Sequence, residues 1–230
     1  MNTLPIISIV SSLFLSSCGD LDPSPSKVKA KGIHASGKTT SKIFPAPVSF
    51  SNAKSSNGFL PVPASPEVIA GSAALPKDKH GMPTYSLADR HRYVRTTAYS
   101  HQENEPGAPW KKNAVGTILK YGKIRSAAAD WSRYPVGTKL KIKGLPHTYI
   151  VDDYGSALVG TNTVDIYHPT LRSMNRWGTR KTEITVIQWG DWDRTLKILS
   201  GRKKYAHTRK MYYATKAKID SGQAKKYASH

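Results

Sequence analysis

Short runs in which apolar and polar residues alternate predict a set of β-strands from about residue 93 onward. Val94, Thr96 and Ala98 alternate with polar neighbours, as in a strand with one buried face. Further strand-like runs follow at residues 138–142, 147–151, 164–167 and 182–189. Glycine and proline residues separate these runs. Several short strands divided by turns favour a small β-barrel.

One short helix is predicted among the strands. Pro169 stands at a first helical position, and Gly178 supplies a stop. Leu171, Met174 and Trp177 recur at helical spacing and would face the barrel. Trp177 is therefore expected in the core rather than on a sugar-binding surface.

The N-terminal part lacks this alternation and predicts an exported, tethered protein. Residues 4–17 form an apolar run of signal-peptide length that ends at Cys18, an arrangement that resembles the bacterial lipobox. We therefore expect a lipoprotein signal peptide over residues 1–17 and a lipid on Cys18, the only cysteine. A signal peptide with an incidental cysteine is the alternative. Residues 18–88 are rich in Ser, Pro and Lys and carry little apolar surface, which predicts a disordered tether.

The expected anchor also predicts a location. After cleavage before Cys18, Asp20 would occupy the third position of the mature chain rather than the second. The usual signal for retention in the inner membrane is then absent. We expect a cell-envelope protein attached to the outer membrane and facing the periplasm.

Composition indicates an anionic partner. The chain holds 35 Lys and Arg against 15 Asp and Glu, a formal net charge of +20. Residues 193–230 form a basic tail, with eleven Lys or Arg and two Asp, hence a net charge of +9. Three interpretations of the tail stay open: a solvated, disordered end, a nucleic-acid-binding end, or attachment to anionic envelope polymers. Export argues against nucleic acid as a partner.

Three aspartates, Asp130, Asp153 and Asp165, stand where predicted strands meet turns or run through the core. Asp165 is flanked by Val164 and Ile166, so desolvation should raise its pKa and favour the protonated form that a general acid requires. Asp153 precedes a turn and is expected to be better solvated and to stay charged. Two such carboxyls could divide the labour of glycoside chemistry, one donating a proton and the other stabilising positive charge. The alternative for Asp130 and Asp153 is ordinary turn chemistry, in which the short side chain caps backbone N–H groups.

The aspartates lie within an ordered set of motifs that resembles the three-aspartate (3D) domain. That family is a double-psi β-barrel related to the C-terminal part of membrane-bound lytic transglycosylase A and to rare-lipoprotein-A-like barrels. The matching segments are Thr97-Ala98-Tyr99, Asp130 to Thr138, Asp153 to Gly160, Asp165-Ile166-Tyr167 and Trp177-Gly178. Two positions depart from the family pattern: Trp131 stands in place of a proline, and Val159 in place of a lysine.

The resemblance implies a fold and a domain plan. It predicts a mainly β chain with a six-stranded double-psi β-barrel and one short helix over residues 89–192. The disordered tether would precede this domain, and the basic tail would follow it.

The resemblance also implies cleavage of peptidoglycan glycan strands, by a lytic transglycosylase or a related glycosyl hydrolase. Asp165 would be the acid and base, Asp153 its helper and Asp130 a loop anchor. The expected substrate-binding residues are Tyr99, Trp131, Gly155, Ala157 and Tyr167. No cofactor or metal is expected for this chemistry. The main alternative is a non-catalytic, expansin-like barrel that binds glycan strands, and a third is a structural lipoprotein that ties membrane to wall.

Overall fold

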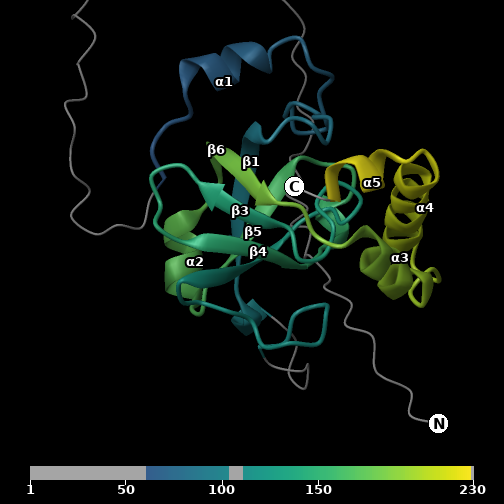
Figure 1. Ribbon diagram of the computed structural model, residues 1–230. Coiled ribbons are helices and arrows are strands. Elements are labelled where there is room, and N and C mark those ends of the chain that lie inside the picture. Colours follow the sequence, from purple (N-terminus) through teal and green to yellow (C-terminus); the bar gives the residue numbers. More distant parts are fainter. Residues whose placement is uncertain (1–60, 104–110, 229–230) are drawn as a thin grey trace, which may run out of the picture. The chain divides into compact units, whose positions relative to one another are not determined.

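The computed structural model describes residues 61–103 and 111–228 (Figure 1). The predicted signal peptide, Cys18 and the first part of the predicted tether lie outside these residues. Six strands form the centre of the fold: β1 (His91–Tyr99), β2 (Ile124–Ala128), β3 (Lys139–Ile142), β4 (Thr148–Asp153), β5 (Thr163–Tyr167) and β6 (Arg180–Gln188). The helices are α1 (Pro66–Gly71), α2 (Leu171–Trp177), α3 (Trp192–Ser200), α4 (Ala206–Asp220) and α5 (Gln223–Ala228), with short 3₁₀ turns η1 (His101–Glu103) and η2 (Ser156–Leu158).

The six strands close into a barrel in the order β1-β5-β2-β4-β3-β6, and β6 pairs back onto β1. Two neighbouring pairs, β1 with β5 and β2 with β4, are parallel, and the other pairs are antiparallel. This arrangement is compatible with a double-psi β-barrel, and the predicted six-stranded fold is confirmed.

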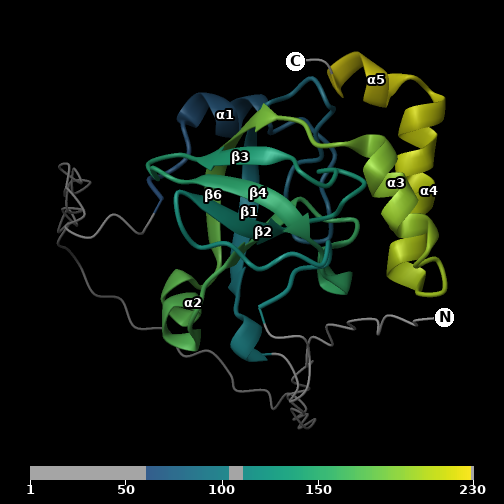
Figure 2. The same cartoon turned by 60° about the horizontal axis from the view of Figure 1, so that its bottom comes forward.

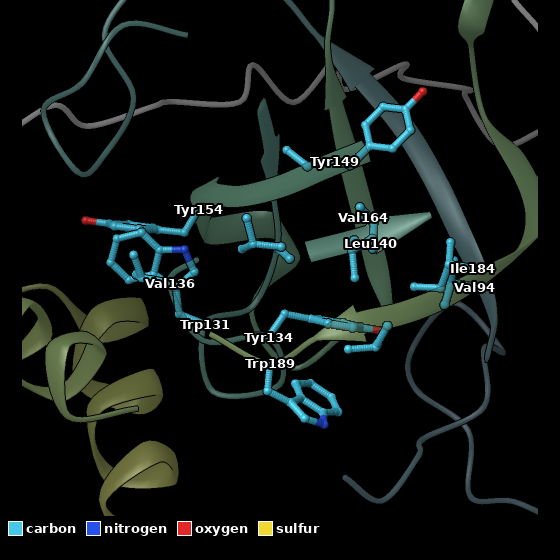
Figure 3. Close-up of a cluster of buried hydrophobic side chains, with 14 of the residues drawn as sticks. Val94, Trp131, Tyr134, Val136, Leu140, Tyr149, Tyr154, Val164, Ile184 and Trp189 are labelled. Atoms are coloured by element: carbon cyan, nitrogen blue, oxygen red, sulfur yellow. The ribbon is translucent and has the colours of Figure 1, made fainter. Parts of the chain in front are cut away.

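Alternation along the strands builds the core of the barrel. In β1 the side chains of Arg92, Val94 and Thr96 are buried, and those between them are partly exposed. Figure 3 shows Val94, Leu140, Val164 and Ile184 converging from four different strands. Each of these side chains is fully buried, so the hydrophobic effect of this core fixes which face of every strand points outward.

Strand β2 was not expected from the sequence, although it lies at the centre of the site described below. Its sequence, Ile-Arg-Ser-Ala-Ala, carries little apolar volume, and only its first residue is exposed. A strand whose consecutive side chains are buried on both faces has no period-two signal. Its position is set by pairing with β4 and β5 instead.

Helix α2 is close to the prediction. It begins at Leu171, after Thr170, whose hydroxyl accepts a hydrogen bond from the Ser173 amide. The first helical residue therefore lies two residues beyond the predicted Pro169. It ends at Gly178, which adopts a φ of 59°. Trp177 is buried in the core, as expected, whereas Leu171 is exposed.

Residues 61–88 are folded onto the barrel, which differs from the predicted tether ending at residue 88. The Ser65 amide and hydroxyl both donate to the Glu183 carboxylate on β6, at 2.9 and 2.6 Å. The Asp78 carboxylate accepts a hydrogen bond from the Asn162 amide at 2.5 Å. Met82 and Leu87 of this stretch are also buried. Apolar packing and these polar contacts to distant residues together give it a fixed place.

The basic tail forms helices α3, α4 and α5 rather than a disordered end. Leu199 of α3 and Met211 of α4 are fully buried and belong to the same hydrophobic core as the barrel. Helices α3 and α4 lie side by side next to the barrel (Figure 2). No helix within residues 61–103 and 111–228 is long and apolar enough to cross a membrane.

The junction between β6 and α3 attaches this helical segment to the barrel. The backbone at Gly190 passes so close to Pro135 and Val136 that a Cβ atom there would lie 2.3–2.4 Å from their carbonyl oxygens. Only glycine fits this approach. The Thr195 hydroxyl then accepts a hydrogen bond from the Val136 amide at 2.9 Å, so α3 is held in place from its first turn.

Candidate active site

Strands β1, β5, β2 and β4 bring the predicted site residues to the outer wall of the barrel. Asp165 on β5 is the cross-strand partner of Thr97 on β1 and of Ala128 on β2. Its neighbours Val164 and Ile166 are buried in the core. Because side chains alternate along a strand, Asp165 points away from that core.

The Asp165 carboxyl lies deep among protein atoms but is still reached by solvent. Thr97 Oγ1 donates a hydrogen bond of 2.6 Å to it. Burial raises the pKa of Asp165 to about 7, the Thr97 hydrogen bond opposes this, and the negative charge of Glu103 adds to it. The predicted rise in the pKa of Asp165 is therefore confirmed, and its protonated form is well populated at neutral pH.

Asp153 at the end of β4 is more enclosed than Asp165, contrary to the prediction that it would be solvated and charged. Its side chain is buried, and Oδ1 accepts hydrogen bonds from the amides of Ala114 (3.1 Å) and Tyr154 (2.9 Å). Oδ2 accepts one from the Tyr99 hydroxyl at 3.2 Å. Burial raises the pKa of Asp153 to about 7, against the lowering effect of its hydrogen bonds. The covering residue Ala114 comes from a distant loop, which the sequence did not reveal.

A small cavity joins the two carboxyls. It has a volume of about 70 Å³ and is lined by Tyr99, Ala128, Asp165 and residues 153–158. Ala128 pairs with both Asp165 and Asp153, so the two aspartate Cα atoms lie about 10 Å apart, two strand spacings. The short side chain of Ala128 leaves the space between them open.

Asp130 lies apart from this cavity and ties two loops together. Its Oδ1 accepts hydrogen bonds from the amide and hydroxyl of Ser132, at 2.9 and 2.7 Å. Its Oδ2 accepts one from the Gly160 amide at 2.7 Å. These are the partners of a loop anchor, the role that the resemblance implied for Asp130.

Helix α4 places a lysine next to the same loop. A Cβ atom at Gly160 would lie 3.2 Å from Lys210 Nζ. The loop itself has Val159 where the family commonly has lysine. The helical segment therefore supplies a cation close to the position where the loop lacks one.

The predicted substrate-binding residues divide into two groups. Tyr99, Gly155 and Ala157 line the cavity. Trp131 does not: it is fully buried, donates its indole N–H to the Asp153 carbonyl at 2.8 Å and packs edge-on against Tyr154. Tyr167 is also buried, and its hydroxyl pairs with His101 Nδ1 at 2.8 Å. The prediction that Trp131 could stack on a sugar is therefore wrong, and Tyr167 supports the ring of Tyr99 instead.

Four residues near the carboxyls were not identified from the sequence as parts of the site. Thr97 holds Asp165, Glu103 in η1 raises the pKa of Asp165, and Asp152 pairs with Lys120 at 2.8 Å. Burial raises the pKa of Asp152 despite that ion pair. Thr97 could have been found, because it aligns with Asp165 once β1 and β5 are paired. Glu103 and Lys120 lie in irregular segments that give no such signal.

Comparison with known families identifies the region that holds all three aspartates. The family model of the 3D domain matches residues 125–189. The chain carries a 3D domain. The comparison with curated proteins yields no match.

The 3D domain is associated with peptidoglycan-related proteins, which gives the chain a peptidoglycan-related role at that coarse level. The matched range begins in β2 and ends just after β6. Strand β1, which contributes Thr97 and Tyr99, lies before the match. Helices α3, α4 and α5 lie after it. Part of the site is therefore built by residues outside the matched 3D range.

The raised pKa of Asp165 predicts a pH-dependent effect on stability. Its pKa is about 7 in the folded protein and about 4 in the unfolded chain. The folded state thus binds this proton more tightly, so the stabilising effect is full below about pH 4 and is lost as the pH rises to about 7. Asp165→Asn cannot ionise and should be stabilised relative to wild type at high pH.

The measurement is the difference in Tm between variant and wild type at about pH 5 and about pH 8. We expect a larger difference at the higher pH, because the variant avoids the free-energy cost of ionising a buried carboxyl. Each kcal/mol of that cost corresponds to about 2–4 °C in Tm. Taking the difference cancels the titration of other groups, such as buried His168, whose pKa is lowered to about 4. An equal difference at both pH values would contradict the assigned pKa.

Proposed function

We propose that this protein cleaves glycosidic bonds of peptidoglycan glycan strands and that Asp165 is its general acid and base. The observation that carries the proposal is the Asp165 carboxyl, which has a pKa of about 7 and opens onto a cavity on the barrel wall. A general acid works best when its pKa lies near the working pH. The match to the 3D domain supplies the class of substrate.

The reaction that fits one good acid is lytic transglycosylation. Protonated Asp165 would donate its proton to the oxygen that links N-acetylmuramic acid to N-acetylglucosamine, and the bond from that oxygen to the anomeric carbon breaks. The Asp165 carboxylate then accepts the proton of the muramoyl 6-hydroxyl as its oxygen attacks the anomeric carbon. The product carries a 1,6-anhydro ring, and Asp165 returns to its protonated form, so no water is consumed.

Asp153 and Tyr99 would assist from the same cavity. Positive charge develops at the anomeric carbon in such a transition state, and a nearby carboxylate stabilises it. Asp153 has a pKa of about 7, so its ionised form is available at neutral pH. Burial and the surrounding carboxylates raise the pKa of Tyr99 well above its usual value. Its hydroxyl therefore remains a hydrogen-bond donor.

A non-catalytic glycan-binding barrel is the second candidate. The observation that favours it is the size of the cavity, about 70 Å³, against roughly 300–1,000 Å³ for ordinary ligand pockets. A glycan-binding barrel would hold the glycan strand across its outer wall. It would not need Asp165 to donate a proton or to lie next to the glycosidic bond. Product analysis separates the two candidates.

We also propose that the protein acts from the cell envelope. A lipid on Cys18 would attach it to the outer membrane on the periplasmic side, and the segment before residue 61 would span the distance to the wall. The support for this location is the sequence alone, from the apolar run ahead of Cys18 to the polar stretch that follows.

The helical tail would hold the protein on its anionic substrate. Nine of its eleven cations are exposed: Arg194, Lys197, Lys203, Lys204, Arg209, Lys210, Lys216, Lys225 and Lys226. Such a surface concentrates a protein on an acidic polymer, with an affinity that falls as salt rises. Anionic envelope polymers are the partners that fit, and no nucleic acid is implied.

Asp165→Asn should abolish release of muropeptides from purified sacculi. The loss of one general acid lowers the rate by about 100- to 10,000-fold. Asp193→Asn is the matched control, because Asp193 is exposed on α3 and remote from the carboxyl cavity. Full activity of Asp165→Asn beside an active control would refute the assignment.

The tail's role calls for charge reversal rather than truncation, because removing residues 193–230 would also remove Leu199 and Met211 from the core. Reversing Arg194, Lys204 and Lys225 to Glu should weaken binding to sacculi on the order of tenfold at low salt. The control reverses Arg172, Arg176 and Lys181, three exposed cations outside the tail. Equal binding by both triple variants, measured by co-sedimentation over a salt series, would contradict a specific role for the tail.

A further inference from the structure

We propose that Arg202, which follows α3 and lies outside the 3D match, is a positioning residue for Asp153. The proposal rests on the proposed function, in which Asp153 assists Asp165. It makes the C-terminal helical segment a part of the active site rather than an appendage.

The guanidinium of Arg202 contacts two separate segments of the barrel. Nη2 donates to the Ala114 carbonyl at 2.7 Å, in the loop that follows η1. Nη1 reaches the Tyr154 hydroxyl at 3.4 Å, and the guanidinium carbon lies 5.7 Å from the centre of the Tyr154 ring. A planar guanidinium can hold two such partners at once.

The same two residues hold the Asp153 carboxyl on their other side. The amides of Ala114 and Tyr154 both donate to Asp153 Oδ1. Arg202 therefore fixes from outside the two residues whose N–H groups orient this carboxyl. One path runs from Arg202 to the Ala114 carbonyl and from the Ala114 amide to Asp153. The other runs from Arg202 to the Tyr154 hydroxyl and from the Tyr154 amide to Asp153.

The ring of Tyr154 is held between the barrel and the helical segment. Trp131 packs against it with ring centres 4.7 Å apart, and His207 of α4 lies 5.9 Å away. The indole of Trp131 also donates to the Asp153 carbonyl. Tyr154 is buried, so a shift of α3 or α4 would be transmitted to the residue next to Asp153.

Arg202 is itself well anchored. Its amide donates to the carbonyl of Leu199, a fully buried core residue, at 3.0 Å. Its carbonyl accepts a hydrogen bond from the Thr208 hydroxyl at the start of α4. Because the backbone of Arg202 is held by these hydrogen bonds, its side chain can restrict the movement of Ala114 and Tyr154.

Loss of Arg202 should change the ionisation of Asp153. The groups that face this carboxyl are Tyr99 from β1, Asp152 from β4, Tyr154 just after β4, Asp165 across the cavity, and the Ala114 amide. The two amide hydrogen bonds favour the ionised form. Loosening them while Asp152 remains in place raises the pKa of Asp153 further.

The experiment is a carbon-13 NMR titration of the aspartate carboxyls in the full-length protein, for wild type, Arg202→Ala and Arg202→Lys. We expect the Asp153 midpoint to move upward in Arg202→Ala and less in Arg202→Lys, which keeps the charge but not the fork. The Asp165 midpoint should stay in place. Lys197→Ala, which removes one exposed charge from α3, is the control and should leave both midpoints unchanged.

Measurement of activity on sacculi gives a second test that is independent of the titration. Arg202→Ala should lower kcat on sacculi by about tenfold or more with little change in KM, the behaviour of a misplaced assisting group. An unmoved Asp153 midpoint in folded Arg202→Ala overturns the proposal, and so does unchanged kcat. If Arg202→Ala does not fold, Arg202→Lys decides by the same two criteria. Inactive wild-type protein would refute the proposed function, while the titration would still test the contact between Arg202 and the Asp153 site.

Discussion

The pairing of β5 between β1 and β2 places a carboxyl in the wall of a closed barrel, and the chemistry of the site depends on that position. Core residues on either side of Asp165 fix the orientation of β5, because a slip of one residue would turn the carboxyl into the apolar interior. Thr97, aligned by the parallel register of β1, supplies a hydrogen bond that holds the carboxyl in place. The burial that comes with this position raises the pKa of Asp165 to about 7, which makes the residue useful as an acid.

Holding two desolvated carboxyls destabilises the folded protein at neutral pH, and the rest of the chain offsets this. The barrel core supports the strands that carry Asp153 and Asp165, the N-terminal stretch is attached at β6, and the C-terminal helices share the hydrophobic core of the barrel. The helices do more than cover apolar surface. Arg202 reaches the residues that bind Asp153, and Lys218 donates to the Ser132 carbonyl beside Asp130. Because Lys218 is enclosed between α4 and the loop that carries Asp130, burial lowers its pKa to about 8.

Much of this arrangement could be predicted from local patterns, and the rest depends on contacts between distant residues. Alternation predicted five of the six strands, and the apolar neighbours of Asp165 predicted its raised pKa. Strand β2 gave no signal because its last four residues are buried on both faces, so apolar and polar positions do not alternate. Asp153 was misjudged because Ala114, which covers it, lies far away in sequence, and Trp131 because its indole turns inward to the Asp153 carbonyl. The helical tail was missed because its many lysines hide the few residues, such as Leu199 and Met211, that reach the core.

If Asp165 is the general acid and base, glycan strands are cleaved by intramolecular attack of the muramoyl 6-hydroxyl and leave a 1,6-anhydro end. Mass spectrometry of purified sacculi incubated with the full-length protein tests it most directly. We expect new muropeptides that end in 1,6-anhydro-muramoyl residues, in amounts that grow with time and enzyme. Sacculi that bind the protein but gain no new glycan ends would contradict it and leave a glycan-binding barrel in its place.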